Sequence, residues 1–212
     1  MLELRDVQIS SGSFTLENLS LSIAPGEYTI VMGQTGSGKT TLLEGICGLR
    51  PVNAGSIKFN GKDVTNLAPQ NRGFGYVPQD LALFRTMTVY ENMAYALKAR
   101  KAPISLIDSS VNDLAKLLEI EELLPRSIAG LSGGQAQRVA LGRALAFEPL
   151  MLLLDEPLSA LDEKTHAKLC ELLKQVQAET QVTVLHVTHD LQEAKRLGDR
   201  IYQFDQGQLT LI

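Results

Sequence analysis

One stretch constrains the fold of this chain more than any other, and it reads Gly33-Gln34-Thr35-Gly36-Ser37-Gly38-Lys39-Thr40. It fits the pattern of a glycine, four variable residues and then Gly-Lys-Ser/Thr. The apolar residues 28–32 before it predict a buried strand, and residues 41–47 after it predict the first turns of a helix. The chain must therefore contain a strand, a glycine-rich loop and a helix in direct succession, which favours an α/β fold.

The loop glycines explain how this stretch can hold a phosphate group. Gly33, Gly36 and Gly38 tolerate a positive φ and carry no side chain, so the backbone N–H groups can surround a polyphosphate. The helix N-terminus adds about half a unit of positive charge at the same place. We expect Lys39 to reach the β- and γ-phosphates and the Thr40 hydroxyl to ligate Mg²⁺. The alternative is a plain glycine-rich turn between a strand and a helix.

Composition limits the remaining possibilities. At 212 residues the chain is expected to form one domain, with room for a subdomain. The net charge of −4 shows no basic footprint, so we expect no nucleic-acid partner. Cys47 and Cys170 lie in apolar helical stretches, which predicts buried thiols in a reducing compartment. The apolar runs are too short to span a bilayer, so we expect a soluble protein.

Hydrophobic periodicity divides the rest of the chain. Residues 2–9 and 14–23 alternate between apolar and polar, which predicts a small antiparallel β layer. From 88 to about 147 the spacing is helical, which indicates an inserted helical subdomain. The runs 150–154 and 182–187 are almost wholly apolar, as central parallel strands are. Helices are expected after these two runs, over 163–178 and 190–197.

A second motif follows the first of these central strands. Asp155 and Glu156 are adjacent carboxylates at the strand end. Downstream of a phosphate loop, we expect Asp155 to hold Mg²⁺ and Glu156 to act on the attacking water as general base. An exposed Asp-Glu turn, stopped by Pro157, is the structural alternative.

A third motif, Leu131-Ser132-Gly133-Gly134-Gln135, narrows the class of protein. Ser132 and Gln135 have the spacing of a capping box that opens a helix over 135–146. A cap does not need glycines in its first turn, where each costs about 0.5–1 kcal/mol relative to alanine. A bare helix N-terminus beside a serine hydroxyl is an anion site. The sequence therefore predicts a second anion-binding position besides the cap.

Together these motifs resemble, over nearly the whole chain, the nucleotide-binding subunits of ATP-binding cassette (ABC) transporters. The matching segments, in the family's order, are Walker A (33–40), the Q-loop glutamine Gln79, the signature (131–135), Walker B (152–156), the D-loop (Ser159-Ala160-Leu161-Asp162) and the switch histidine His189. The resemblance implies an α/β P-loop NTPase (RecA-like) core. This core has a mainly parallel sheet, an N-terminal antiparallel β layer and a helical insertion. We expect one ABC ATPase domain over 1–212, with the core in 1–84 and 148–212 and the helical subdomain in 85–147.

The resemblance also implies a head-to-tail homodimer with ATP at its interface. One subunit would bind ATP through residues 33–41, Thr41 included, with Glu156, His189 and Gln79 as catalytic residues. The Mg²⁺ ligands would be Thr40, Gln79 and Asp155. The partner would cover the nucleotide with Ser132, Gly133, Gly134, Gln135 and Asp162. Structural alternatives remain for His189, as an exposed residue at a helix start, and for Asp162, as a helix cap.

The family usually places an aromatic side chain before Walker A to stack on adenine. Phe14 is the nearest aromatic residue to the turn at 10–13, so we expect it to take this role. A core position in an alternating strand is nearly as good an interpretation of Phe14.

The stretch 74–92 resembles importer subunits, in which it docks a membrane permease. It departs from the importer pattern at Arg85-Thr86, as does the later Gly142. Residues 11–14 and 184–191 are similar to molybdate/tungstate importer ATPases. The resemblance thus implies permease partners, indirectly an extracytoplasmic solute-binding protein, and a place on the inner face of the cell membrane. The alternatives are a non-transport ABC ATPase and a P-loop kinase, although a kinase leaves the 131–135 motif unexplained.

Overall fold

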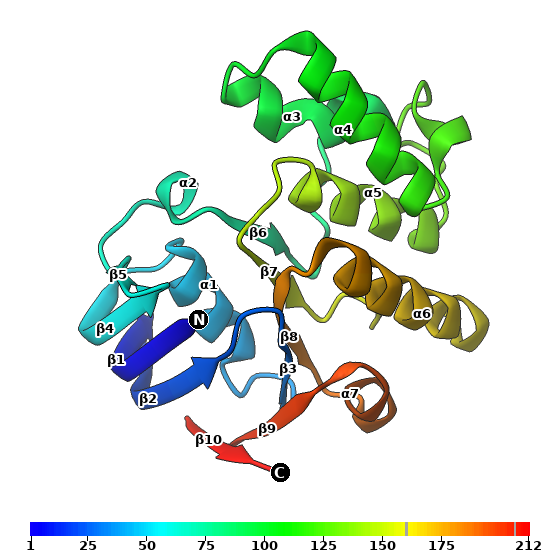
Figure 1. Cartoon of the computed structure of the whole chain (residues 1–212). Coiled ribbons are helices and arrows are strands. Elements are labelled where there is room, and N and C mark those ends of the chain that lie inside the picture. Colours follow the sequence, from blue (N-terminus) through cyan, green and yellow to red (C-terminus); the bar gives the residue numbers. More distant parts are fainter. Residues whose placement is uncertain (160, 206) are drawn as a thin grey trace.

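The strands of this protein form two sheets (Figure 1). The computed structural model describes residues 1–159, 161–205 and 207–212. Ala160 of the predicted D-loop lies outside the described residues. The smaller sheet has the order β2-β1-β4-β5, and all of its pairs are antiparallel. Its strands are β1 (Leu2–Ser11), β2 (Phe14–Ile23), β4 (Val52–Phe59) and β5 (Lys62–Asp63). The antiparallel β layer expected from residues 2–23 is confirmed.

The larger sheet has the order β10-β9-β3-β8-β7-β6. Its strands are β3 (Tyr28–Met32), β6 (Phe74–Val77), β7 (Met151–Asp155), β8 (Thr183–Thr188), β9 (Arg200–Asp205) and β10 (Gln208–Leu211). Every pair except β9–β10 is parallel. The carboxyl ends of β3, β7 and β8 therefore meet at one edge, where ligands bind in open α/β sheets.

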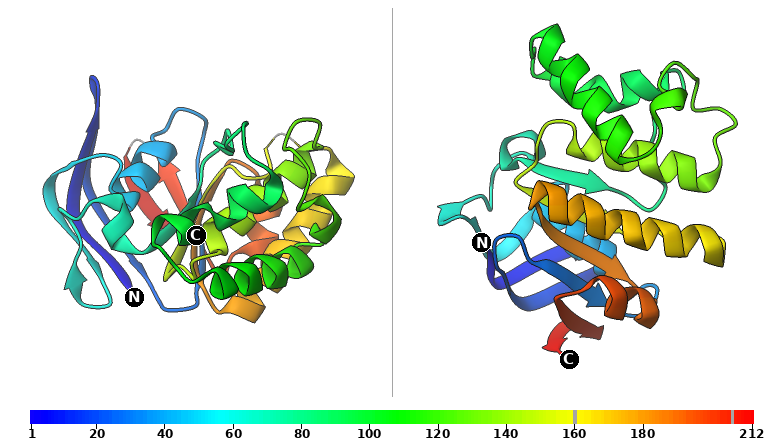
Figure 2. Two further views of the ribbon diagram at one scale, coloured as in Figure 1. Left: turned by 90° about the horizontal axis from the view of Figure 1, so that it is seen from above. Right: turned by 45° about the vertical axis from the view of Figure 1, so that its right-hand side comes forward.

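Alternating residues of the central strands enter two different cores. In β7, Leu152 and Leu154 pack with the helices on one face, whereas Met151 and Leu153 pack with the smaller sheet on the other. Helix α1 (Lys39–Cys47) lies on this second face, in contact with both β1 and β7 (Figure 2). It ends at Gly48, whose φ of +88° forms a left-handed C-cap.

The other helices, except a short one next to α1, gather on the opposite face and beyond it. They are α3 (Val89–Ala99), α4 (Ile104–Leu117), the 3₁₀ turn η1 (Glu121–Leu123), α5 (Gly133–Leu145), α6 (Glu163–Thr180) and α7 (Leu191–Leu197). Helix α5 contacts β6 as well as α3, α4 and α6, and so joins the outer helices to the sheet (Figure 2). The helical block expected over 88–147 is confirmed, and its use as a subdomain with boundaries at 85 and 147 stays a prediction.

Two local expectations differ from the structure. Leu150 was expected inside a buried strand, but β7 begins at Met151 and Leu150 is 56% exposed. The Leu150 N–H donates to the carbonyl of Gly73 before β6, so Leu150 lies at the edge of the sheet where β6 and β7 begin. The short helix α2 (Pro69–Arg72) had no sequence prediction. Cys47 and Cys170 are both free and buried, as expected, and burial raises the pKa of each thiol to about 11.

Candidate functional site

The glycine-rich loop connects the end of β3 to the start of α1. The Gly33 N–H donates to the carbonyl of Thr188 at the end of β8, at 3.2 Å. A Cβ on Gly33 would lie 2.5 Å from the Phe204 carbonyl oxygen, so a larger residue does not fit there. Gly36 and Gly38 have φ values of +84° and +102°, the left-handed region that glycine tolerates. The loop therefore has the conformation that the glycine spacing predicts.

Lys39 lies inside this loop and is almost fully buried. Its Nζ donates to the carbonyls of Gly33 at 2.8 Å and Gln34 at 2.9 Å. It also pairs with Glu156 Oε1 at 3.1 Å, and the two side chains are only 4% and 9% exposed. Buried ions need such pairing, because removing one partner leaves an uncompensated charge. A cation is thus fixed against the glycine-rich loop by two loop carbonyls and one carboxylate.

Ser37 gives a further sign that the loop fits a phosphate group. Its Oγ is buried and has no hydrogen-bond partner among the described residues. Buried hydroxyl groups are nearly always hydrogen-bonded, so this one is available to a ligand. The residues present therefore match the chemistry of a polyphosphate.

Asp155 ends β7 beside the start of α1. The Thr40 hydroxyl donates to its Oδ1 at 3.1 Å, and the Tyr76 hydroxyl donates to its Oδ2 at 3.3 Å. Burial raises the pKa of Asp155 in spite of these hydrogen bonds. A hydroxyl and a carboxylate are the hard oxygen ligands that Mg²⁺ uses together with substrate phosphates. Among the described residues, no group of three or more His, Cys, Asp or Glu side chains is arranged so that it could hold a metal ion.

Glu156 follows with an unusual backbone. Its φ is +43°, in the left-handed region that a non-glycine residue rarely adopts, and its N–H donates to the Val187 carbonyl at 3.0 Å. Its Oε2 lies 3.1 Å from Nδ1 of His189, a side chain that is half exposed. Such strain concentrates at functional sites. The structure thus brings Lys39, Glu156 and His189 together, as well as Thr40 and Asp155.

Other predicted residues of this site are less closely joined. Gln79 lies exposed just after β6, and within the described chain no hydrogen bond connects it to Thr40 or Asp155. Thr41 is buried in α1. Phe14 is 40% exposed, and its ring packs so closely on the loop that a Cβ on Gly38 would lie 2.7 Å from Phe14 Cε1. Phe14 is therefore beside the loop rather than in the core.

The 131–135 motif opens α5 with the predicted capping box. The Gln135 N–H donates to Ser132 Oγ at 3.3 Å, and the Ser132 N–H donates to Gln135 Oε1 at 2.9 Å. Gly134 has a packing reason that the sequence did not reveal, because a Cβ there would lie 2.7 Å from Thr165 Cγ2 of α6. Gly133 and Ser132 are exposed. A Cβ on Gly133 would lie 3.2 Å from Leu161 Cδ2, a looser contact, so the glycine argument for an anion site is stronger at Gly133 than at Gly134.

Asp162 caps α6, as its structural alternative proposed. Its carboxylate accepts from the Thr165 N–H at 3.1 Å, and hydrogen bonds from Thr165 hold its pKa below the ordinary value. Within the described residues no hydrogen bond or ion pair links Asp162 or the 132–135 motif to the glycine-rich loop. One chain thus presents two separate groups of predicted ATP contacts.

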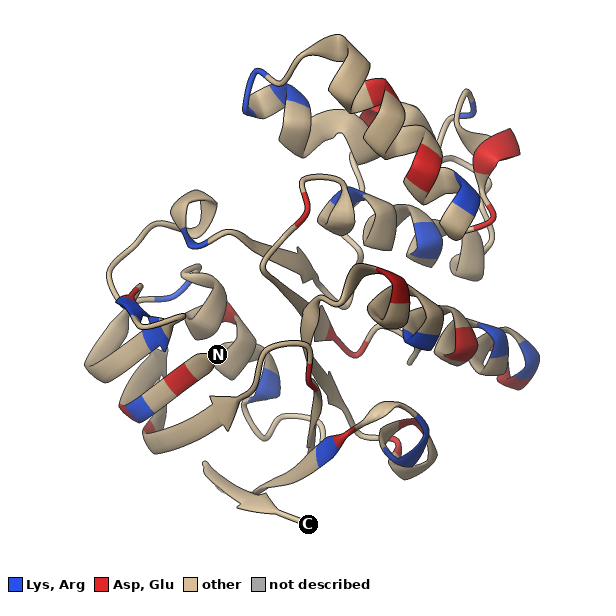
Figure 3. Cartoon of the chain, viewed as in Figure 1, with Lys and Arg blue, Asp and Glu red and all other residues tan. Residues whose placement is uncertain are grey.

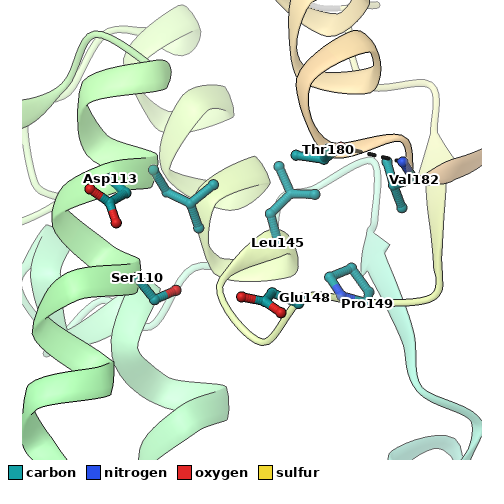
Figure 4. Close-up of a pocket in the computed structure, with 8 residues that line it drawn as sticks. Ser110, Asp113, Leu145, Glu148, Pro149, Thr180 and Val182 are labelled. Atoms are coloured by element: carbon teal, nitrogen blue, oxygen red, sulfur yellow. Dashed lines mark hydrogen bonds between the residues drawn. The ribbon is translucent and has the colours of Figure 1, made fainter.

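A pocket of about 400 Å³ lies elsewhere, between α4 and the C-terminal ends of α5 and α6 (Figure 4). Its lining includes Asp113, Glu148 and the apolar Leu145. Both charged groups in this lining are acidic, which disfavours a phosphate ligand. Lys, Arg, Asp and Glu are otherwise interspersed over the molecule (Figure 3).

Tyr76 is the site residue that the sequence analysis missed. It lies in β6, and only the parallel pairing of β6 with β7 brings its hydroxyl to Asp155. An aromatic residue in a short strand carries no sequence signal for such a contact.

No helix in the described ranges combines the length and apolar character that a bilayer crossing requires.

Comparison with known proteins agrees with this geometry. Residues 16–159 match the family model described as "ABC transporter". A molybdate/tungstate import ATP-binding protein, WtpC, of Thermococcus kodakarensis is 45% identical over 199 residues, which cover 94% of this chain and 60% of that relative. The sulfate/thiosulfate import ATP-binding protein CysA of Bacillus cereus is 43% identical over 98% of this chain and 60% of its own length. The chain therefore spans about 60% of the length of these curated relatives.

Solved structures show the same fold. The dimeric structure of MJ0796, a bacterial ABC transporter cassette, has a TM-score of 0.86 and 32% identity, and the match covers 99% of this chain and 96% of that one. The same cassette has a dimeric post-hydrolysis structure bound to ADP and Pi, with a TM-score of 0.85. The predicted α/β P-loop fold is thus confirmed, and this chain belongs to the ABC transporter family.

Proposed function

We propose that this chain binds and hydrolyses ATP, with residues 33–41 around the phosphates and Glu156 as the general base. The observation that carries the proposal is the contact between buried Lys39 and buried Glu156 at the end of the loop, with half-exposed His189 beside Glu156. The cation proposed for the phosphates and the base proposed for water thus lie 3.1 Å apart. General-base catalysis needs such positioning and contributes about 10²–10⁴-fold in rate.

The contacts of Lys39 suggest how ATP would engage the site. Lys39 Nζ now pairs with Glu156 Oε1 at 3.1 Å, and a polyphosphate would compete for the same cation. When Lys39 turns to the β- and γ-phosphates, the Glu156 carboxylate is released to accept a proton from water. His189, which already lies beside Glu156 Oε2, would donate a hydrogen bond to the γ-phosphate.

Thr40 and Asp155, with Gln79 from the loop after β6, would hold Mg²⁺. The bound ion would neutralise the charge on the phosphate oxygens. Phe14, next to Gly38, would stack on the adenine ring.

The second half of the ATP site would come from another copy of this chain. Ser132 and Gly133 lie exposed at the N-terminus of α5, where the helix dipole and the backbone N–H groups favour an anion. In a head-to-tail homodimer this end, with Gln135, Asp162 and the closely packed Gly134, would cover the partner's triphosphate. The dimeric relative bound to ADP and Pi supports this arrangement.

We also propose that the chain serves an importer, docking a membrane permease at the cytoplasmic membrane face, with a solute-binding protein as indirect partner. A mainly apolar groove of about 520 Å³ supports this, lined by Pro78, Phe84, Tyr95 and Phe147 among others. Arg143 of α5 donates to the carbonyls of Leu81 at 2.7 Å and Ala82 at 2.5 Å, and so holds the loop at its edge.

The names of the curated relatives suggest an oxyanion such as molybdate or tungstate as solute. A non-transport ABC ATPase is the alternative. Capture of permease subunits when the chain is purified from membranes favours import, and recovery with a soluble macromolecular complex favours the alternative.

The test is steady-state release of phosphate from ATP in the presence of Mg²⁺. We expect turnover by the unaltered chain and a fall of about 10²–10⁴-fold in Glu156→Gln, with ATP binding retained. Hydrolysis by Glu156→Gln at the unaltered rate would remove Glu156 from the mechanism.

A further inference from the structure

A line of buried polar side chains lies behind the candidate site, between the sheet and helices α6 and α7. We call it the Glu193 network, and its members are Tyr28 of β3, His166 of α6, His186 and Thr188 of β8, and Glu193 of α7. All except His166 are at least nine-tenths buried. The proposed function uses none of them.

Glu193 is the centre of this network. Its Oε2 accepts a hydrogen bond from the Thr188 hydroxyl at 2.7 Å. Its Oε1 lies 2.9 Å from His186 Nε2, in an arrangement too bent for a well-aligned hydrogen bond. Burial raises the pKa of Glu193, but His186, Thr188 and His166 outweigh burial and leave that pKa below its ordinary value. Glu193 is therefore an ionised carboxylate inside the protein, and the Thr188 hydroxyl is its well-aligned donor.

The proton positions in the network follow from Tyr28. Burial, with the Glu193 charge nearby, raises the pKa of Tyr28 well above its ordinary value, so the phenol keeps its proton. Its hydroxyl lies 3.0 Å from His186 Nδ1 and can donate to it. When Nδ1 accepts from Tyr28, the proton of His186 lies on Nε2, which faces Glu193 Oε1. This tautomer gives each polar atom a complementary neighbour, so the network fixes the Glu193 carboxylate in one place.

The Glu193 carboxylate fixes Thr188, and Thr188 in turn makes hydrogen bonds to the backbone of the candidate site. The Thr188 carbonyl accepts from the Gly33 N–H at 3.2 Å, and the preceding Val187 carbonyl accepts from the Glu156 N–H at 3.0 Å. The Thr188 hydroxyl also accepts from the Asp190 N–H at 3.1 Å, so it spans the backbone of His189. The end of β8 therefore sets the start of the glycine-rich loop, the backbone of Glu156 and the position of His189 together.

We infer that Glu193 is a positioning residue for ATP hydrolysis, acting through Thr188 on Glu156 and His189. The inference rests on the proposed function. Glu193 does not touch the reacting atoms; it fixes the end of β8, which precedes His189 and accepts a hydrogen bond from the Glu156 N–H. Small misplacements of reacting groups can cost about 10²-fold in rate. If the contact between Thr188 and Glu193 were purely structural, its loss would lower the stability of the protein and leave the kcat of the folded protein unchanged.

The test compares kcat and KM for ATP in Glu193→Gln, Thr188→Val and Thr188→Ser, on folded protein well below each variant's Tm. Glu193→Gln removes the charge, and Thr188→Val removes the hydroxyl with little change of shape. We expect kcat to fall about 10–100-fold in both, while KM changes less than about threefold. Thr188→Ser keeps the hydroxyl although it deletes a buried methyl group, so its kcat should stay within about threefold of the unaltered chain.

Glu171→Gln is the matched control. Glu171 of α6 pairs with Arg196 of α7 on the exposed surface, with Oε1 3.0 Å from Arg196 Nε. Its loss weakens the contact between the same two helices without changing Thr188. Its kcat should be unchanged. If the unaltered chain hydrolyses ATP and the Glu193→Gln and Thr188→Val enzymes keep its kcat, the inference is wrong while the proposed function stands. If the unaltered chain does not hydrolyse ATP, the proposed function itself fails. Should Glu193→Gln not fold, the two Thr188 variants decide.

Discussion

Two regions of this molecule have the features of a phosphate site, and they differ in how far their polar groups are already paired. In the Walker half (residues 33–41, 155, 156 and 189), Lys39 is buried against Glu156, and Thr40 is bonded to Asp155. In the signature half (residues 132–135 and 162), Ser132 and Gly133 are exposed and bond within their own helix cap. Burial raises the pKa of Asp155, whereas hydrogen bonds lower that of exposed Asp162.

The difference shows which half can act alone. The Walker half brings Lys39, the proposed base Glu156 and the proposed metal ligand Asp155 close to one another, so we expect a single chain to bind nucleotide there. The signature half has a helix N-terminus and a hydroxyl but no cation or base bonded to it among the described residues. It can complete a site that another chain begins, which is why we propose a dimer.

Lys39→Ala tests the Walker half with the largest expected effect. The loss of charge-assisted bonds worth about 1.5–3 kcal/mol should weaken ATP binding about 10–100-fold, measured by calorimetric titration. The free protein should also lose stability, because Glu156 is left buried and unpaired.

The double variant Lys39→Ala/Glu156→Gln is the control for this loss. It removes the stranded charge and should recover part of the Tm without recovering ATP affinity. If affinity returned together with stability, Lys39 would be a structural residue and not a phosphate ligand.

Ser132→Ala tests the signature half, and Thr88→Ala is its matched control. Thr88 caps α3 with the same capping box, its Oγ1 accepting from the Glu91 N–H at 3.1 Å, but it has no place in the proposed ATP site. Each variant should lose about 0.5–2 kcal/mol of stability.

Hydrolysis by the isolated chain should separate the two cap variants. We expect Ser132→Ala to lower kcat about 10-fold, and Thr88→Ala to leave it unchanged. Equal activities would mean that Ser132 is a helix cap and nothing more.

The smallest expected effect is the pH dependence of the stability that the Glu193 network contributes. The pKa of Glu193 is lowered in the folded protein, so its contribution to stability is present above the ordinary glutamate pKa of about 4.3 and is lost as the pH falls through the lowered value. The titratable side chains that face Glu193 are His186 and His166.

The Tm difference between the unaltered chain and Glu193→Gln should therefore persist from pH 7 to about pH 5 and shrink below about pH 4. Thermal melts across this range measure it. A difference that grew below pH 4 would contradict an ionised Glu193.

The sequence predicted those parts of the fold that local periodicity determines. The alternation of apolar and polar residues in 14–23 indicated a strand with one buried face. The apolar run in 182–187 indicated a strand buried on both faces. Leu150 was misassigned because an apolar run does not show where strand pairing begins. The motif spacing predicted the conformation of the glycine-rich loop, the capping box, and the position of two adjacent carboxylates at a strand end.

Contacts between elements distant in the chain could not be predicted. Tyr76 reaches Asp155, and Gly134 makes room for Thr165, only because of sheet order and helix packing. The Glu193 network joins β3, β8, α6 and α7, so none of its contacts except that of Thr188 with Glu193 is local.

The most direct test is the mass of the Glu156→Gln chain in solution with saturating ATP and Mg²⁺, measured by size-exclusion chromatography with light scattering. The account predicts a dimer of the 23.1 kDa chain with ATP, and a return to monomer when Ser132→Ala and Gly133→Asp are added. A chain that binds ATP in calorimetry yet remains monomeric at saturation would contradict the claim that two chains share each ATP site.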